Sequence, residues 1–167
     1  MYASFIFAAV FLGYAIGVAP IISFNYGAQN HDEMKNVLKK SVILNVIAGV
    51  VMTVLSVALA RPLSSIFVGY DAALLDMTTV AMRIYSISFI FMGLNIFTSS
   101  FFTALNNGLI SAIVSFARTL VFQISAVMLL PLAFGLNGIW AAIIVAELLA
   151  LILGVIFILT NRKKYGY

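Results

Sequence analysis

One stretch of the sequence decides the fold: residues 138–160 read GIWAAIIVAELLALILGVIFILT, and Arg162-Lys163-Lys164 follows almost at once. Glu147 is the single charged side chain within that stretch. The hydrocarbon core of a bilayer is about 30 Å thick, and a helix needs about 20 consecutive apolar residues to cross it. The stretch is long enough for this crossing, and the basic residues behind it are typical of the cytoplasmic end of a membrane helix.

The rest of the chain has the same character. Its 167 residues are 64% hydrophobic and 8% charged, and the mean hydropathy is +1.17, whereas soluble domains carry about 25% charged residues. This composition indicates that the chain lies in lipid and not in water. We expect an all-α integral membrane protein, a single transmembrane helical domain over residues 1–167. Its five spans are expected at about 2–24, 41–60, 84–105, 109–131 and 138–160.

Short polar segments and prolines mark the expected helix ends. Asn30 and Glu33 have the spacing of a capping box, which predicts that a helix begins there. Asp71 is expected to cap a short helix in the connection between the second and third spans. The second span is expected between Lys39–Lys40 and Arg61–Pro62, and the fourth is expected to close at Pro131.

Composition also excludes several classes of site. The chain has no cysteine, so disulfides, iron–sulfur clusters and thiolate zinc sites are excluded, and one histidine, His31, cannot build a histidine-rich metal site. We expect no cofactor, and no pattern of an enzyme active site is present. The net charge of +4 does not indicate nucleic acid, because the basic residues flank apolar runs instead of forming a stripe.

Charge asymmetry predicts the orientation. Lys35, Lys39 and Lys40 follow the first span, and the basic residues 162–164 follow the fifth, so both groups lie on one side of the membrane. The positive-inside rule places that side, with the C-terminus, in the cytoplasm, in a multi-pass protein of the cell (inner) membrane. Met1 is then outside, with no basic leader before the first span. We therefore interpret the chain as a fragment that an earlier span precedes.

Two charges at membrane depth are the most informative residues. Arg118 lies about nine residues into the fourth span, or roughly 13 Å at 1.5 Å per residue, and Glu147 lies at a similar depth in the neighbouring antiparallel span. Each should face protein or water, because a charge at the bilayer centre costs about 2.5–3.5 kcal/mol on insertion scales. Two interpretations stay open: an ion pair that orients two helices, or a transport pathway in which Glu147 responds to protons or cations. Asn95 and Ser99 either bridge helices or line a polar cavity.

Several motifs together resemble the multidrug and toxic compound extrusion (MATE) transporters. The stretch GYAIGVAPIISFNYGA at residues 13–28 looks like the ending of that family's second span of a six-helix repeat. SSFFTALNNGLIS at 99–111 is similar to its turn between the tenth and eleventh spans. SFAR at 115–118 and PLAFGLNGIW at 131–140, followed by Glu147, look like its last two spans. The resemblance covers essentially the whole chain and fits the bacterial drug-export branch.

The resemblance implies a larger assembly. The family has twelve spans in two six-helix lobes, of which this chain would supply spans eight to twelve, most of the C-terminal lobe, with the N-terminal lobe missing. It exports small amphipathic cationic compounds in exchange for H+ or Na+ by alternating access. Substrate would sit between the lobes, with Glu147 and Arg118 in coupling and Asn95 and Ser99 on the cavity wall. Sodium-driven relatives carry an aspartate in the middle of the third span, whereas residues 91–95 here read FMGLN, which argues against sodium at that position.

Two other functions stay open. A lipid-linked sugar flippase can share a similar architecture, and a small non-transporting scaffold subunit is the alternative of a different class. Coding sequence for further spans directly upstream would favour the transporter, and a genuine start at Met1 with a separate partner would favour the subunit.

Overall fold

The computed structural model describes residues 2–167, which form helices joined by short turns. By length and composition, four of these helices can cross a membrane, or up to five spans arise if the bent pair α3 and α4 counts as one. The expected all-α membrane architecture is confirmed. In chain order the elements are α1 (Tyr2–Gly27), α2 (His31–Val68), α3 (Ala72–Ser86), α4 (Phe89–Ala104), α5 (Gly108–Phe116), the π-helix η1 (Ala117–Phe122), α6 (Gln123–Phe134) and α7 (Leu136–Tyr165).

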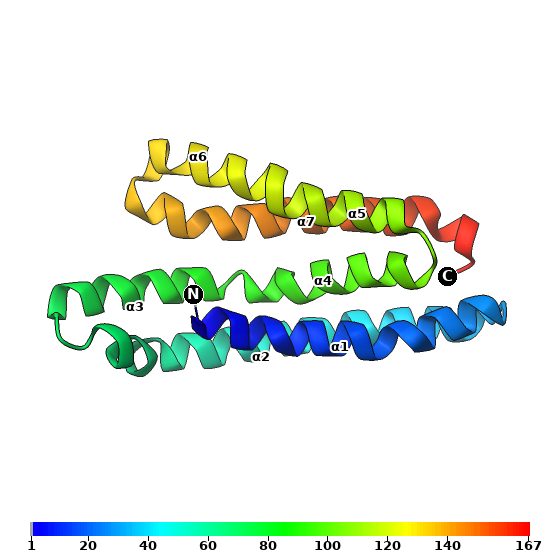
Figure 1. The fold of residues 1–167 in the computed structure, drawn as a ribbon, viewed down its shortest axis with the longest axis horizontal. Helices are drawn as coiled ribbons and strands as arrows, with labels where there is room; N and C mark the ends of the chain where they lie inside the picture. The colour runs from blue at the N-terminus through cyan, green and yellow to red at the C-terminus, as the bar shows by residue number, and fades with distance from the viewer. Residues whose placement is uncertain (1) are drawn as a thin grey trace.

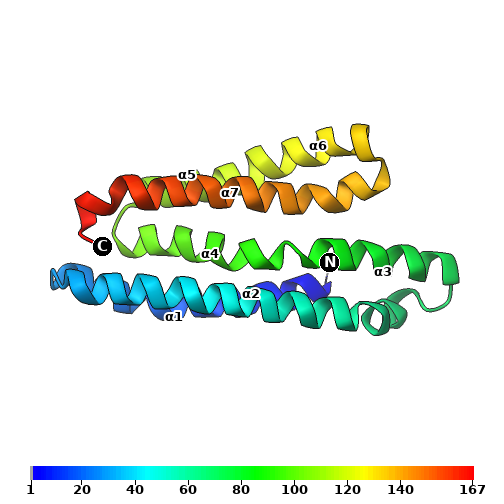
Figure 2. The ribbon, with the colours of Figure 1, turned by 180° about the vertical axis from the view of Figure 1, so that it is seen from behind.

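The long helices run roughly side by side in three layers (Figure 1). One layer holds α1 and α2, the middle layer holds α3 and α4 end to end, and the third holds α7 with the segment α5–η1–α6 (Figures 1 and 2). The middle helix α4 packs against α1, α2, α5 and α7. Every other layer is therefore assembled around α4.

Polar caps start the helices where the sequence predicts. The Asp71 carboxylate accepts hydrogen bonds from the backbone N–H of Ala73 at 2.9 Å and of Leu74 at 3.1 Å, which begins α3. Asn30 Oδ1 accepts from the N–H of Glu33 at 3.2 Å, which begins α2. Both predicted starts are confirmed, because a side-chain acceptor here satisfies backbone donors that have no partner within the helix.

The two proline predictions are wrong. Helix α2 continues through Pro62 to Val68, and α6 continues through Pro131 to Phe134. A helical proline removes the hydrogen bond to the carbonyl four residues earlier, but membrane helices tolerate this loss and often continue through it. Instead, α6 ends at Gly135, whose φ of +57° lies in the region that favours glycine.

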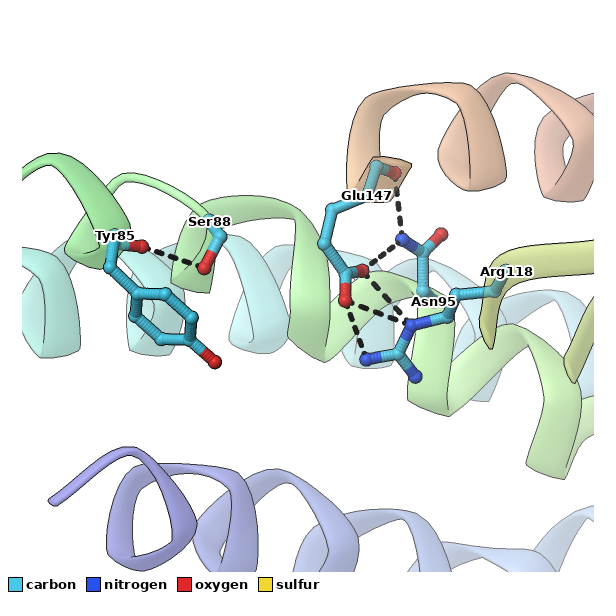
Figure 3. A network of polar contacts seen from close by, with 5 residues as sticks. All are labelled: Tyr85, Ser88, Asn95, Arg118 and Glu147. Atoms are coloured by element: carbon cyan, nitrogen blue, oxygen red, sulfur yellow. Dashed lines mark hydrogen bonds and ion pairs between the residues drawn. The ribbon is translucent and has the colours of Figure 1, made fainter. Parts of the chain in front are cut away.

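The predicted third span, 84–105, is not one straight helix. It contains the break between α3 and α4, where the axis bends by 47°. Hydroxyl groups satisfy the carbonyls around the break: Thr53 donates to the Ser86 carbonyl at 2.9 Å, and Ser88 donates to the Tyr85 carbonyl at 2.7 Å (Figure 3). Such bonds let irregular backbone persist inside a bundle.

The last residues of the chain fold back into the largest core cluster. The Tyr167 ring lies 4.9 Å from the Phe101 ring, centroid to centroid, and 6.2 Å from the stacked ring of Tyr165. Asn107 Nδ2 donates to the Tyr165 hydroxyl at 2.7 Å, which ties α7 to the turn between α4 and α5. Burial raises the pKa of Tyr167, and Tyr165 adds to this effect. Tyr165 also contacts Tyr26, so the tail and the end of α1 share one end of the bundle.

Candidate functional site

A buried carboxylate is the centre of the candidate site. Glu147 lies midway along α7 and is only 6% exposed. Small residues flank it at helical spacing, and Ala142, Ala146 and Ala150 are all buried. Small side chains let neighbouring helices approach α7 closely. The carboxylate is thereby enclosed by protein and is kept away from lipid.

Arg118 reaches this carboxylate from the π-helix. Its Nη2 lies 2.7 Å from Glu147 Oε1, and its Nε lies 2.9 Å from Oε1 and 3.1 Å from Oε2. These contacts join two charges face to face and are the strong, charge-assisted kind. The sequence predicted that the two side chains lie at a common depth, and the structure brings them into contact. The Arg118 side chain stays 23% exposed, so one side of the guanidinium is open.

The π-helix itself is a feature that the sequence did not indicate. The backbone N–H of Gln123 donates to the carbonyl of Arg118, five residues earlier, which is the π pattern in place of the α pattern. An inserted residue of this kind rotates the following side chains relative to a regular helix. Single π-turns of this kind are frequently found at functional sites.

Asn95 completes the arrangement from α4. Its Nδ2 donates to Glu147 Oε2 at 2.6 Å and to the Glu147 backbone carbonyl at 2.8 Å (Figure 3). Its Oδ1 is buried and has no hydrogen-bond partner among residues 2–167. One carboxylate therefore links three elements, α7, η1 and α4. The sequence left open whether Asn95 bridges helices or lines a cavity, and this bond bridges α4 and α7.

Ser99 lies one turn further along α4 and does not contact the carboxylate. Its hydroxyl lies 2.8 Å from that of Ser115 and 3.0 Å from that of Ser111, both on α5. Ser99, Ser115 and Arg118 nevertheless line one groove of about 330 Å³, with α1 contributing Leu12 and Ala15 to its wall. The predicted site residues thus form two adjoining groups, a carboxylate cluster and a hydroxyl-lined groove.

The described residues offer no cluster of side chains that could bind a metal ion. Within residues 2–167, no set of three or more His, Asp or Glu side chains is placed to hold a metal ion. Both oxygens of Glu147 already accept hydrogen bonds from Arg118, and Oε2 also accepts one from Asn95. Donors from this chain therefore occupy both oxygens of the carboxylate.

The comparisons with known proteins agree with this fold. A family model described as MatE matches residues 1–129. One similar solved structure is described as the inward-facing conformation of a multidrug resistance MATE family transporter of the MOP superfamily, with a TM-score of 0.90 and 17% identity over 98% of this chain. The outward-facing conformation of such a transporter is similar at a TM-score of 0.90 and 18% identity, again over 98% of this chain. The chain spans 38% and 37% of the lengths of those two chains. No curated protein matches the chain.

Proposed function

Since the chain belongs to the MatE family, we propose that it forms most of one lobe of a transporter that exports amphipathic cations in exchange for protons. The observation that carries this proposal is the Glu147 carboxylate, 6% exposed and held by Arg118 and Asn95. A membrane-buried ionisable group with a defined partner is the usual mark of an ion or proton pathway. The substrate class comes from the family resemblance.

Protonation of Glu147 would change which helices are held together. The ionised carboxylate accepts three contacts from Arg118. Once neutral, it loses the charge that those contacts depend on, and Arg118 becomes a buried charge in need of water or another acceptor. The segment carrying Arg118 then gains freedom to shift against α7. Such a shift is the local event that a rocking, alternating-access cycle requires.

The same geometry favours protons over sodium. A sodium ion needs several oxygen ligands with few competing donors nearby, whereas Arg118 and Asn95 already donate to the Glu147 carboxylate. The helix α4 carries no carboxylate of its own. A proton needs only one carboxylate oxygen, and it removes the negative charge without bringing a coordination shell.

The test uses the assembled transporter, this chain together with the lobe that completes it, in proteoliposomes. Ethidium serves as the cationic probe, and a pH gradient drives its movement. We expect Glu147→Gln to abolish proton-driven ethidium exchange while Glu33→Gln, an exposed acid on α2, keeps it. Normal exchange by Glu147→Gln would refute the coupling role. The flippase and scaffold alternatives both predict no ethidium movement by the unaltered protein.

Orientation is part of the proposal. We infer that the end with the lysines of α2 and the tail of α7 faces the cytoplasm, because of its excess of Lys and Arg. Single cysteines replacing Asp32 at that end and Tyr70 at the other end test this in intact cells, and both positions are exposed. An impermeant thiol reagent should label Tyr70→Cys and leave Asp32→Cys unlabelled. The opposite result would invert the topology.

A further inference from the structure

Four hydroxyl groups form a continuous chain of contacts between α4 and α5. Thr103 Oγ1 lies 2.7 Å from Ser111 Oγ, Ser111 Oγ lies 3.0 Å from Ser99 Oγ, and Ser99 Oγ lies 2.8 Å from Ser115 Oγ. We call this set the hydroxyl ladder. Hydroxyls in membrane helices often bond to a carbonyl of their own helix, as Thr98 does here to the Leu94 carbonyl. In the ladder, consecutive hydroxyls contact one another across two helices.

Each contact in the ladder can form in either direction. A hydroxyl group has one donor and two acceptor positions, and its hydrogen rotates to suit its neighbours. In one direction Ser115 donates to Ser99, Ser99 to Ser111, and Ser111 to Thr103, which donates to the Ser99 carbonyl at 3.0 Å. The reverse order satisfies the same three contacts. Ser99 Oγ also approaches the Ser111 carbonyl at 3.4 Å, which is a weaker acceptor position.

One end of the ladder is exposed near the end of α4, and the other end lies close to Arg118. Thr103 is exposed and stands in the last turn of α4, beside the turn where Asn107 bonds to the tail of α7. Ser115 lies three residues before Arg118, and both line the groove of about 330 Å³. A water molecule needs only about 10–15 Å³ of accessible volume and two to four polar partners. The groove therefore has room for water beside Ser115 and beside Arg118, whose guanidinium contacts the Glu147 carboxylate.

We propose that the hydroxyl ladder is a proton path between Glu147 and the end of the lobe that carries the basic residues; this rests on the proposed function. Water gives a proton to Thr103 Oγ1, which passes its own proton to Ser111, and Ser99 and Ser115 relay in turn. Ser115 gives a proton to water in the groove, and that water protonates the Glu147 carboxylate. Each hydroxyl ends with one proton, so one proton moves and no electrons do. Release from Glu147 follows the reverse order, with Arg118 reforming the pair.

The experiment compares variants of the assembled transporter in proteoliposomes, with ethidium as probe and entrapped pyranine as the pH reporter. We expect Ser99→Ala, which removes the central hydroxyl, to slow proton-driven exchange about tenfold or more, the scale set by losing a proton-transfer group. Ser99→Thr keeps a hydroxyl and should restore most of the rate. Ser100→Ala is the matched control, because Ser100 lines the same groove but donates to the Ala15 carbonyl. Ethidium binding without a pH gradient should be unchanged in Ser100→Ala.

The outcomes separate this path from the proposed function. Ser115→Ala truncates an exposed side chain and should slow proton movement as Ser99→Ala does, so it decides the question if Ser99→Ala does not fold. Normal proton-driven exchange in Ser99→Ala or Ser115→Ala, together with loss in Glu147→Gln, overturns the path and leaves the function standing. Normal exchange in Glu147→Gln overturns the function and the path with it. Equal slowing by Ser100→Ala overturns the path by showing that any change in this groove has the same effect.

Discussion

The central helix α4 and the peripheral segment α5–η1–α6 differ in how many of their residues the bundle buries. More than half of the residues of α4 are buried, among them Phe97, Phe101 and Phe102. By contrast, α5 and α6 each bury one residue, Val114 and Ala126, and η1 buries none. The peripheral segment supplies Arg118 and half of the hydroxyl ladder.

We infer from this difference that α4 is the fixed centre of the lobe and that the peripheral segment is the part that shifts during transport. Between helices in lipid, association depends on close packing and on hydrogen bonds, because lipid tails are as apolar as the side chains. The packing around α4 extends over many aromatic rings, so no single contact holds that helix in place. The peripheral segment packs on α7 through the apolar cluster of Ala126, Ala142 and Ala146, and polar contacts of Arg118 and of the hydroxyl ladder add to this attachment. Four predictions test this contrast, from the largest expected effect to the smallest.

The ion pair should give the largest effect. We expect Glu147→Leu and Arg118→Leu each to lower the free energy of unfolding in detergent by on the order of 3–5 kcal/mol, because each leaves one buried charge unpaired. The double substitution should recover more than half of that loss. A double-mutant cycle on thermal unfolding measures the coupling. Strictly additive losses would mean that the two side chains do not interact.

The aromatic packing of α4 should come next. Phe101 is fully buried and its ring lies 5.8 Å from that of Phe97 and 5.9 Å from that of Phe102. We expect Phe101→Ala to cost about 3 kcal/mol, the low end for such truncations, because the unfolded ring enters lipid or detergent instead of water. Phe116→Ala on α5 is the control, since that ring is 58% exposed. Equal losses in thermal stability would erase the distinction between frame and periphery.

Adding a methyl group to a glycine should destabilise the protein beside α4 but not on α5. A Cβ at Gly49 of α2 would lie 2.9 Å from the Cα of Ile90 and 2.9 Å from the carbonyl oxygen of Phe89, both backbone atoms of α4. We expect Gly49→Ala to cost about 2 kcal/mol, because two helices must separate to admit the methyl group. Gly108→Ala on α5 meets no atom within 4 Å and should be neutral or stabilising. A Gly49→Ala protein that unfolds at the unaltered temperature would contradict this contact.

The hydrogen bond from Asn107 to the Tyr165 hydroxyl should have the smallest effect. Tyr165→Phe keeps the buried ring and removes the acceptor for Asn107 Nδ2, so we expect a loss of about 1 kcal/mol. Tyr70→Phe, at a ring that is 83% exposed, is the control. Hydrogen exchange at the turn between α4 and α5 should also rise in Tyr165→Phe. Unchanged exchange there would mean that ring packing alone holds the tail.

Several features followed from the sequence because their causes are local. A window of about 20 apolar residues is sufficient for a membrane helix, and the Asn30 and Asp71 caps involve partners two or three residues away. The common depth of Arg118 and Glu147 also came from counting along two helices joined by a short turn. Local signals did not reveal that α2 and α6 continue through Pro62 and Pro131, or that the predicted third span is bent by 47°.

The tertiary structure decided the remaining features, because they depend on how whole helices meet. The bond from Asn95 to Glu147 joins residues 52 positions apart, and it forms only because α4 packs against α7 at one particular rotation. The bend lies before α4, and the π-helix lies between α5 and α6; neither irregularity is visible in the hydropathy of the sequence. The hydroxyl ladder likewise requires Ser99 and Thr103 on α4 to meet Ser111 and Ser115 on α5. Lipid makes helix formation nearly obligatory for each span alone, whereas the register between spans is set by the fit of all their side chains at once.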